Sequence, residues 1–150
     1  MKRAWLAAAV CAAAMPASCE SDEPQTEASL LPADHASFPE VRGCRFSVDH
    51  DAIYVRVFTN PQAQAAYTDG VYPFAPGTVL LKHYYRDAGC TDLQGYGLMQ
   101  RLDDGEAPEQ LDWHWQELDA DGKVQAIEVA ACVSCHDSCT AGRDGACTDP

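Results

Sequence analysis

Short segments rich in apolar residues run through the middle of the chain, and their alternation with polar positions predicts β-strands that bury one face. The segment at residues 53–59 is the clearest, because β-branched and aromatic side chains fill it and Asn60-Pro61 ends it. Three further segments have the same character and predict strands at residues 78–86, 96–102 and 111–118.

Helix and turn signals separate these strands. Pro61 suits the first turn of a short helix that ends at Asp69-Gly70. In the last strand Trp113 and Trp115 fall on one face, and a tight turn at residues 119–122 follows. Strands joined by short connections predict an α+β domain in which an antiparallel sheet predominates and the helices are short.

Composition narrows the range of functions. The 150 residues include 47 % hydrophobic and 22 % charged residues, which suits one domain with a packed core. The 10 Lys and Arg residues face 23 Asp and Glu residues, so the formal net charge is -13. This acidic balance argues against binding nucleic acid and against docking on anionic lipid, since both need a basic surface.

The N-terminus has the pattern of an export signal. Basic residues at positions 2 and 3 precede the apolar residues 4–15, which are too few to span a bilayer. Ala17 and Ser18 then precede Cys19, as in a bacterial lipobox. We expect residues 1–18 to be removed and Cys19 to carry the lipid; ordinary cleavage near Ala17, which leaves Cys19 as a thiol, is the alternative.

Acidic and small polar residues dominate residues 19–38, which predicts a flexible tether ahead of a domain at residues 39–150. The protein is therefore expected on the periplasmic side of a bacterial membrane, held to that membrane only through its lipid.

The run Cys132-Val133-Ser134-Cys135-His136 is the attachment pattern of c-type haem. Two thiols separated by two residues can bond to the two haem vinyl groups, and the next histidine can bind the iron. A redox dithiol or half of a zinc site are the alternatives. No second C-x-x-C and no H-x-x-x-H completes a zinc set in the sequence. We expect one covalent haem c on Cys132, Cys135 and His136.

Four cysteines are left for disulfides: Cys44, Cys90, Cys139 and Cys147. An even set of four allows three pairings. Because Cys139 and Cys147 bracket a short glycine-containing loop, the pairing Cys139–Cys147 with Cys44–Cys90 is favoured.

The chain resembles the cytochrome P-460 family, which includes cytochrome c′-β. A haem run near the C-terminus, after a mostly β domain, is the layout of that family. The resemblance covers most of residues 50–140, and the stretches that carry it are residues 57–61, 74–82, 112–115 with 121–122, and the haem run. It implies a predominantly β fold, often a homodimer, with one c-type haem on His136.

The resemblance also implies a ligand class of small nitrogen species, with NO or CO for the c′-β members and hydroxylamine for the oxidising members. In the oxidising members a lysine after the Gly-Thr-Val stretch cross-links to the porphyrin, and Lys82 stands at that position. Their acidic residue in the strand before the Trp segment has no counterpart in residues 96–101. Arg56 stands one place from the family's distal arginine and would face the other side.

These observations predict an exported monohaem c-type cytochrome that binds NO or CO, or passes single electrons to a redox partner protein. A hydroxylamine-oxidising enzyme with a haem cross-linked to Lys82 is the alternative. Met99 is a possible sixth iron ligand or a core residue, and the histidines at positions 35, 50, 83 and 114 are expected at the surface rather than on iron. We therefore expect an open distal face with an apolar lining.

Overall fold

The computed structural model describes residues 27–125, 129–139 and 142–147. One antiparallel sheet of six strands forms its centre, and each strand pairs with the next one along the chain. The strands are β1 (Glu40–Ser47), β2 (Ile53–Thr59), β3 (Val79–Tyr85), β4 (Leu93–Arg101), β5 (Trp113–Asp119) and β6 (Val124–Gln125). The helices are α1 (Gln64–Asp69) and α2 (Val129–Asp137), with 3-10 turns η1 (His35–Ser37), η2 (Pro61–Ala63) and η3 (Pro108–Gln110).

The predicted mostly antiparallel α+β class is confirmed. The four predicted strands correspond to β2, β3, β4 and β5, although β4 begins earlier, at Leu93. The predicted helix corresponds to η2 and α1, and Gly70 ends α1 in the left-handed conformation that suits glycine (φ 66°). The sequence pattern missed β1, because this edge strand is half exposed and its register shifts between Glu40 and Arg45.

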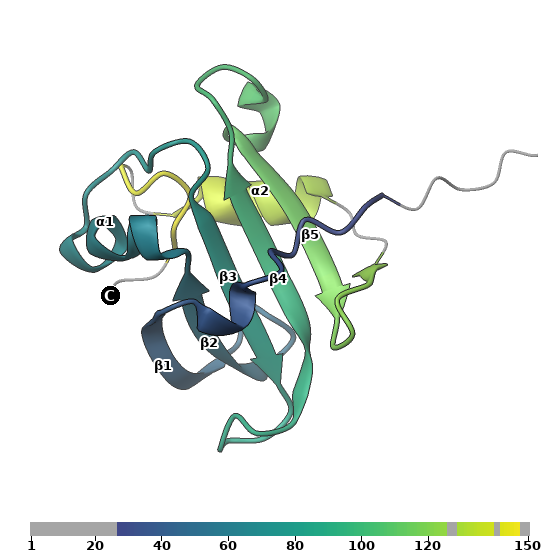
Figure 1. Ribbon diagram of the computed structural model, residues 1–150. Helices are drawn as coiled ribbons and strands as arrows, with labels where there is room; N and C mark the ends of the chain where they lie inside the picture. The colour runs from purple at the N-terminus through teal and green to yellow at the C-terminus, as the bar shows by residue number, and fades with distance from the viewer. Residues whose placement is uncertain (1–26, 126–128, 140–141, 148–150) are drawn as a thin grey trace, which may run out of the picture.

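The two faces of the sheet carry separate hydrophobic clusters, and different segments cover them (Figure 1). We call the face covered by α2 the inner face and the face covered by the N-terminal segment the outer face. The inner cluster contains Val57, Leu80, Met99, Trp113 and Trp115. The outer cluster contains Phe38, Val79, Leu81, Tyr96, Leu98 and Leu118. The period of two along each strand produces this division, and it confirms that Trp113 and Trp115 share a face.

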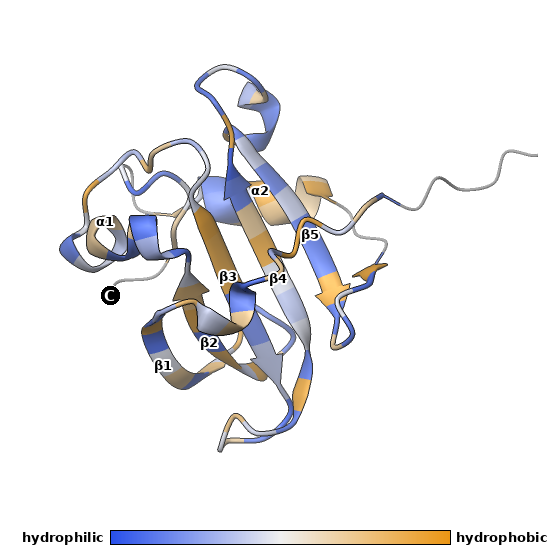
Figure 2. Cartoon of the chain, in the orientation of Figure 1, coloured by the Kyte–Doolittle hydropathy of each residue, from blue (hydrophilic) through white to orange (hydrophobic). Residues whose placement is uncertain are grey.

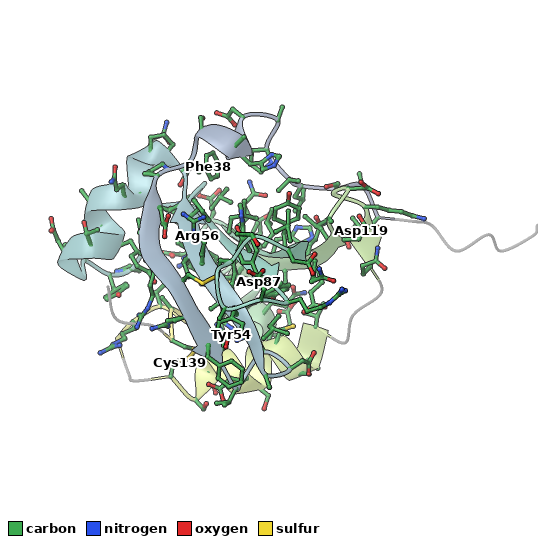
Figure 3. The ribbon with its side chains drawn as sticks, turned by 90° about the horizontal axis from the view of Figure 1, so that it is seen from below. Phe38, Tyr54, Arg56, Asp87, Asp119 and Cys139 are labelled. Carbon is green, nitrogen blue, oxygen red and sulfur yellow. A yellow bond between two sulfur atoms is a disulfide. The ribbon has the colours of Figure 1, made fainter. Side chains whose placement is uncertain are left out.

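Figure 2 shows hydrophobic residues in the middle strands, whereas the loop before β5 is mostly hydrophilic. In Figure 3, Phe38 and Cys139 lie on opposite sides of the sheet, on the N-terminal and the α2 side respectively.

Residues 28–38 pack on the outer face, so the tether expected at residues 19–38 does not extend over them. The buried amide of Gln116 accepts a hydrogen bond from Leu30 N (2.8 Å) and donates one to Ala28 O (2.9 Å). Phe38 is only 7 % exposed, because it closes the outer cluster. The expected signal, Cys19 and residues 20–26 lie outside the described residues. Within the described ranges, no helix combines the length and apolar character needed to cross a bilayer.

A disulfide joins Cys44 of β1 to Cys90 in the β3–β4 connection, with a Cα–Cα distance of 6.0 Å. This is the pairing that the sequence favoured. The bond ties the edge strand β1 to a loop that is 46 residues away in sequence. Closing a loop of this length contributes about 4 kcal/mol to stability in the chain-entropy model.

The sequence analysis expected His83 at the surface, but it lies on the outer face among aromatic rings. Its ring stacks on Phe58 with a centroid distance of 4.2 Å and meets the edge of Tyr96 at 4.9 Å. Burial lowers the pKa of His83 to about 4, and the positive charges of His35 and Arg56 add to the effect. The folded protein therefore takes up this proton only at a lower pH than the unfolded chain does.

This pKa predicts a loss of stability on acidification. Above the unfolded pKa of about 6.5, His83 is neutral in both states and folding carries no penalty from it. As the pH drops towards 4, the unfolded chain takes up the proton first, and the free energy of unfolding falls by up to about 3 kcal/mol. In urea unfolding followed by circular dichroism, His83→Gln should lose less stability than the wild type between neutral pH and the folded pKa of about 4. Equal losses in His83→Gln and the wild type would contradict this assignment.

Candidate functional site

A cavity of about 340 Å³ lies between the inner face and α2. Its size falls within the range of ligand and cofactor sites. It brings together residues that are far apart in sequence, including those that the sequence analysis selected: Lys82, Met99, Cys132, Cys135 and His136. Cys19 lies outside the described residues, and Cys44 and Cys90 do not line the cavity.

Helix α2 presents the haem run to this cavity. Residues at i, i+3 and i+4 lie on one side of an α-helix, so Cys132, Cys135 and His136 share a side. Both cysteines are free thiols. Cys132 is half-buried against the inner cluster, whereas Cys135 is exposed, which places the second thiol nearer to solvent. The sequence pattern did not reveal that the run is helical, because α2 lacks a clear separation of apolar and polar sides.

His136 is held in a defined orientation. Its ring meets the ring of Trp115 edge to face at a centroid distance of 4.8 Å. Its Nδ1 lies 2.6 Å from the carbonyl oxygen of Gly145. Since a carbonyl can only accept, Nδ1 carries the proton and donates, and the lone pair on Nε2 remains for a metal. Burial lowers the pKa of His136, which favours the neutral form that binds metals.

The loop after α2 is closed by the second favoured disulfide, Cys139–Cys147, with a Cα–Cα distance of 4.9 Å. The two sulfurs and a nitrogen of His136 lie within 4.8 Å of one another. Because both sulfurs are joined to each other, this cluster offers no thiolate to a zinc ion. This second cluster therefore provides no zinc site of its own.

The thiol of Cys132 also differs from that of a redox dithiol. Burial raises its pKa, and the carboxylate of Glu117 adds to the effect. Reactive dithiols instead have a thiol whose pKa is lowered by neighbouring positive charge or a helix N-terminus. The Cys132 thiol is therefore not activated in that way.

The sheet supplies the opposite wall through a row of residues that pair across four strands. Val57, Lys82, Gly97 and Glu117 are successive partners from β2 to β5, and all line the cavity. Glu117 thus provides a carboxyl group at the pocket although β4 has no acid. Desolvation raises its pKa, and the charge of Asp51 contributes. The alternation that places Trp113 and Trp115 on the inner face also applies to Glu117, and could have identified it.

His50 is a pocket residue that the sequence analysis expected at the surface. Its Nε2 lies 2.7 Å from Lys82 Nζ, and its Nδ1 lies 2.9 Å from Ser47 Oγ. Burial lowers the pKa of Lys82 to about 8 and that of His50 to about 4. At neutral pH the Lys82 ammonium therefore donates to the neutral His50 ring. A histidine in a polar turn carries no periodic signal, which is why the pattern did not reveal it.

The rest of the lining is mainly apolar and includes Tyr67, Leu80, Met99 and Trp115. Arg56 points to the outer face, where it pairs with Glu40 and lies over Phe58, so it is remote from the cavity as expected. The expected apolar lining is thus only partly correct. Lys82, His50 and Glu117 form a polar wall beside an apolar floor.

No protein-family model matches this chain, and no curated protein sequence matches it. The functional argument therefore depends on the residues of the cavity and their geometry.

The shape of the sheet wall depends on Gly97. A Cβ at this position would overlap the phenol of Tyr84, so Gly97→Ala must push that ring out of its place beside the cavity. We expect the substitution to lower the free energy of unfolding by about 1–3 kcal/mol, the usual cost of overpacking. Gly43→Ala on β1 is the control, because its Cβ would meet its nearest neighbour at an ordinary 3.5 Å. Urea unfolding followed by circular dichroism measures both, and equal effects would contradict the prediction.

Proposed function

We propose that this protein is an exported monohaem c-type cytochrome of the cytochrome P-460 kind that binds a small ligand such as NO or CO. Cys132 and Cys135 hold the haem covalently in the cavity, and His136 binds its iron. One observation carries the proposal: two free thiols and an imidazole with an available Nε2, all on one side of α2, line the same cavity.

The residues present fit this cofactor. When bound, the haem supplies an iron centre that takes up a diatomic ligand or a single electron. The thiols of Cys132 and Cys135 anchor the ring, and the hydrogen bond from His136 Nδ1 to Gly145 O sets the direction of the ligating nitrogen. The apolar floor formed by Leu80, Met99 and Trp115 excludes water from the buried part of the site.

The alternative iron ligands are already engaged, which supports an open sixth position. Both ring nitrogens of His50 have hydrogen-bond partners, Lys82 Nζ and Ser47 Oγ. Met99 is 9 % exposed and belongs to the inner cluster, as a core residue does. Electron-transfer cytochromes fill the sixth coordination position of the iron with a Met or His. A sixth position without such a ligand favours binding of an external ligand.

A second candidate is hydroxylamine oxidation. Lys82, the lysine that the resemblance selects for a cross-link, lines the cavity, and Glu117 supplies a carboxyl group to the same lining. Partial neutralisation of Lys82 is favoured by its lowered pKa of about 8. A strongly red-shifted ferrous Soret band, absent in Lys82→Arg, would identify this candidate, and an ordinary c-type band would identify ligand binding or electron transfer.

Export and lipid attachment at Cys19 complete the proposal and depend on the sequence pattern of residues 1–19. Export agrees with the disulfides Cys44–Cys90 and Cys139–Cys147, because disulfides persist in oxidising compartments.

The proposal predicts haem that survives denaturation. Wild-type protein from cells that mature c-type haem should stain for haem after denaturing electrophoresis, because thioether bonds do not dissociate. The double variant Cys132→Ala with Cys135→Ala should lose the stain. Ser134→Ala, within the same run, is the matched control and should keep it. Removal of the wild-type haem by acid-acetone extraction would show that the group is not covalently bound.

The proposal also predicts a ferrous protein that is high-spin and five-coordinate and binds CO without first losing a ligand. Met99→Leu should leave this spectrum unchanged, since the residue acts as core and Leu conserves its volume. Visible and resonance Raman spectra with and without CO provide the measurement. A low-spin ferrous spectrum that becomes high-spin in Met99→Leu would instead favour electron transfer.

A further inference from the structure

We infer that Asp144, held by Arg101, is a positioning residue that sets the hydrogen bond on His136 and thereby the strength of the iron–histidine bond. The inference rests on the proposed haem site. It assigns a function to a buried ion pair that touches neither the cavity nor the haem run.

Arg101 is a fixed anchor at the end of β4. Its side chain is 5 % exposed, although it is charged. Nη1 donates to the carbonyl oxygens of Asp112 (2.8 Å) and Leu102 (3.2 Å), and Nη2 donates to Asp104 Oδ1 (2.6 Å). The guanidinium also lies over the ring of Trp113. These contacts fix the orientation of the guanidinium group and therefore the direction in which Nε donates.

Nε donates to Asp144 Oδ2 at 3.1 Å, and this carboxylate links three parts of the fold. The same oxygen accepts from Phe74 N at 2.9 Å. The carbonyl oxygen of Asp144 accepts from Trp113 Nε1, also at 2.9 Å. Asp144 is therefore bound through both its side chain and its backbone, and its side chain is only 13 % exposed.

The residue after Asp144 carries the acceptor for His136. Asp144 and Gly145 adopt consecutive left-handed conformations, with φ of 51° and 73°. An aspartate tolerates this region poorly compared with glycine, so the contacts of its side chain maintain it. In this conformation Gly145 O lies 2.6 Å from His136 Nδ1. The position of the acceptor thus follows from the anchoring of Asp144.

The consequence for the haem follows from the chemistry of imidazole. A strong acceptor at Nδ1 orients the ring and makes Nε2 a better donor to the metal. A better donor strengthens the iron–histidine bond and favours the ferric state, which lowers the reduction potential. Weakening the anchor should therefore weaken that bond and raise the potential, even though Asp144 and Arg101 do not contact the haem.

The test uses the haem-loaded full chain with Asp144→Ala. The iron–histidine stretching band of the ferrous protein, read by resonance Raman, should move to lower frequency and broaden, and the reduction potential should rise. Asp144→Asn should restore much of the wild-type band, because asparagine accepts hydrogen bonds and tolerates the left-handed region. Asp104→Asn is the matched control: its side chain is 82 % exposed, and asparagine keeps the oxygen that accepts from Arg101 Nη2, so the band should stay at its wild-type position.

An unchanged band and potential in Asp144→Ala, with only a lower melting temperature, would show that the ion pair is merely structural and would overturn the inference. If Asp144→Ala does not accumulate, Asp144→Asn and Arg101→Lys test the inference instead. Their iron–histidine stretching band should then also move to lower frequency than in the wild type, by a smaller amount than expected for Asp144→Ala. A wild type without covalent haem would instead contradict the proposed function, and the two failures are thus distinct.

Discussion

The packing of α2 against the inner face is the interaction on which the site depends. Cys132 and Val133 contact the cluster that includes Leu80, Met99 and Trp115, and this contact orients the helix. Since one side of the helix carries both thiols and His136, its orientation directs all three into one cavity. The disulfide Cys139–Cys147 and the anchored Asp144 then hold the loop that follows the helix. The fold thus holds both the haem run and the described part of the loop that follows it.

The opposite wall has a different physical character. A lysine buried beside a cavity loses hydration, and the lowered pKa of Lys82 records this cost. His50 accepts a hydrogen bond from it, and Glu117 lies two strands away in the same row. Perturbed titratable groups around one cavity are typical of functional sites. Together with the apolar floor, this wall would give the small ligand that we propose both a dry compartment and hydrogen-bonding groups.

The sequence predicted the central strands and the common face of Trp113 and Trp115, because both depend on local periodicity. It favoured both disulfides because Cys139 and Cys147 bracket a short loop. It did not reveal β1 or the packing of residues 28–38, since their burial depends on tertiary partners such as Gln116. His50 lies in a turn, where periodicity gives no information. The contribution of Gly145 could not be predicted at all, because a backbone carbonyl is present at every residue and only the fold selects one.

The central claim is that Cys132, Cys135 and His136 bind one haem. The most direct measurement is the intact mass of the mature protein from cells that attach c-type haem, with and without a thiol-alkylating reagent. We expect the mass of the polypeptide plus one haem, and no alkylation of Cys132 or Cys135, because both sulfurs are thioethers. A mass without haem, with both thiols alkylated or joined to each other, would contradict the account.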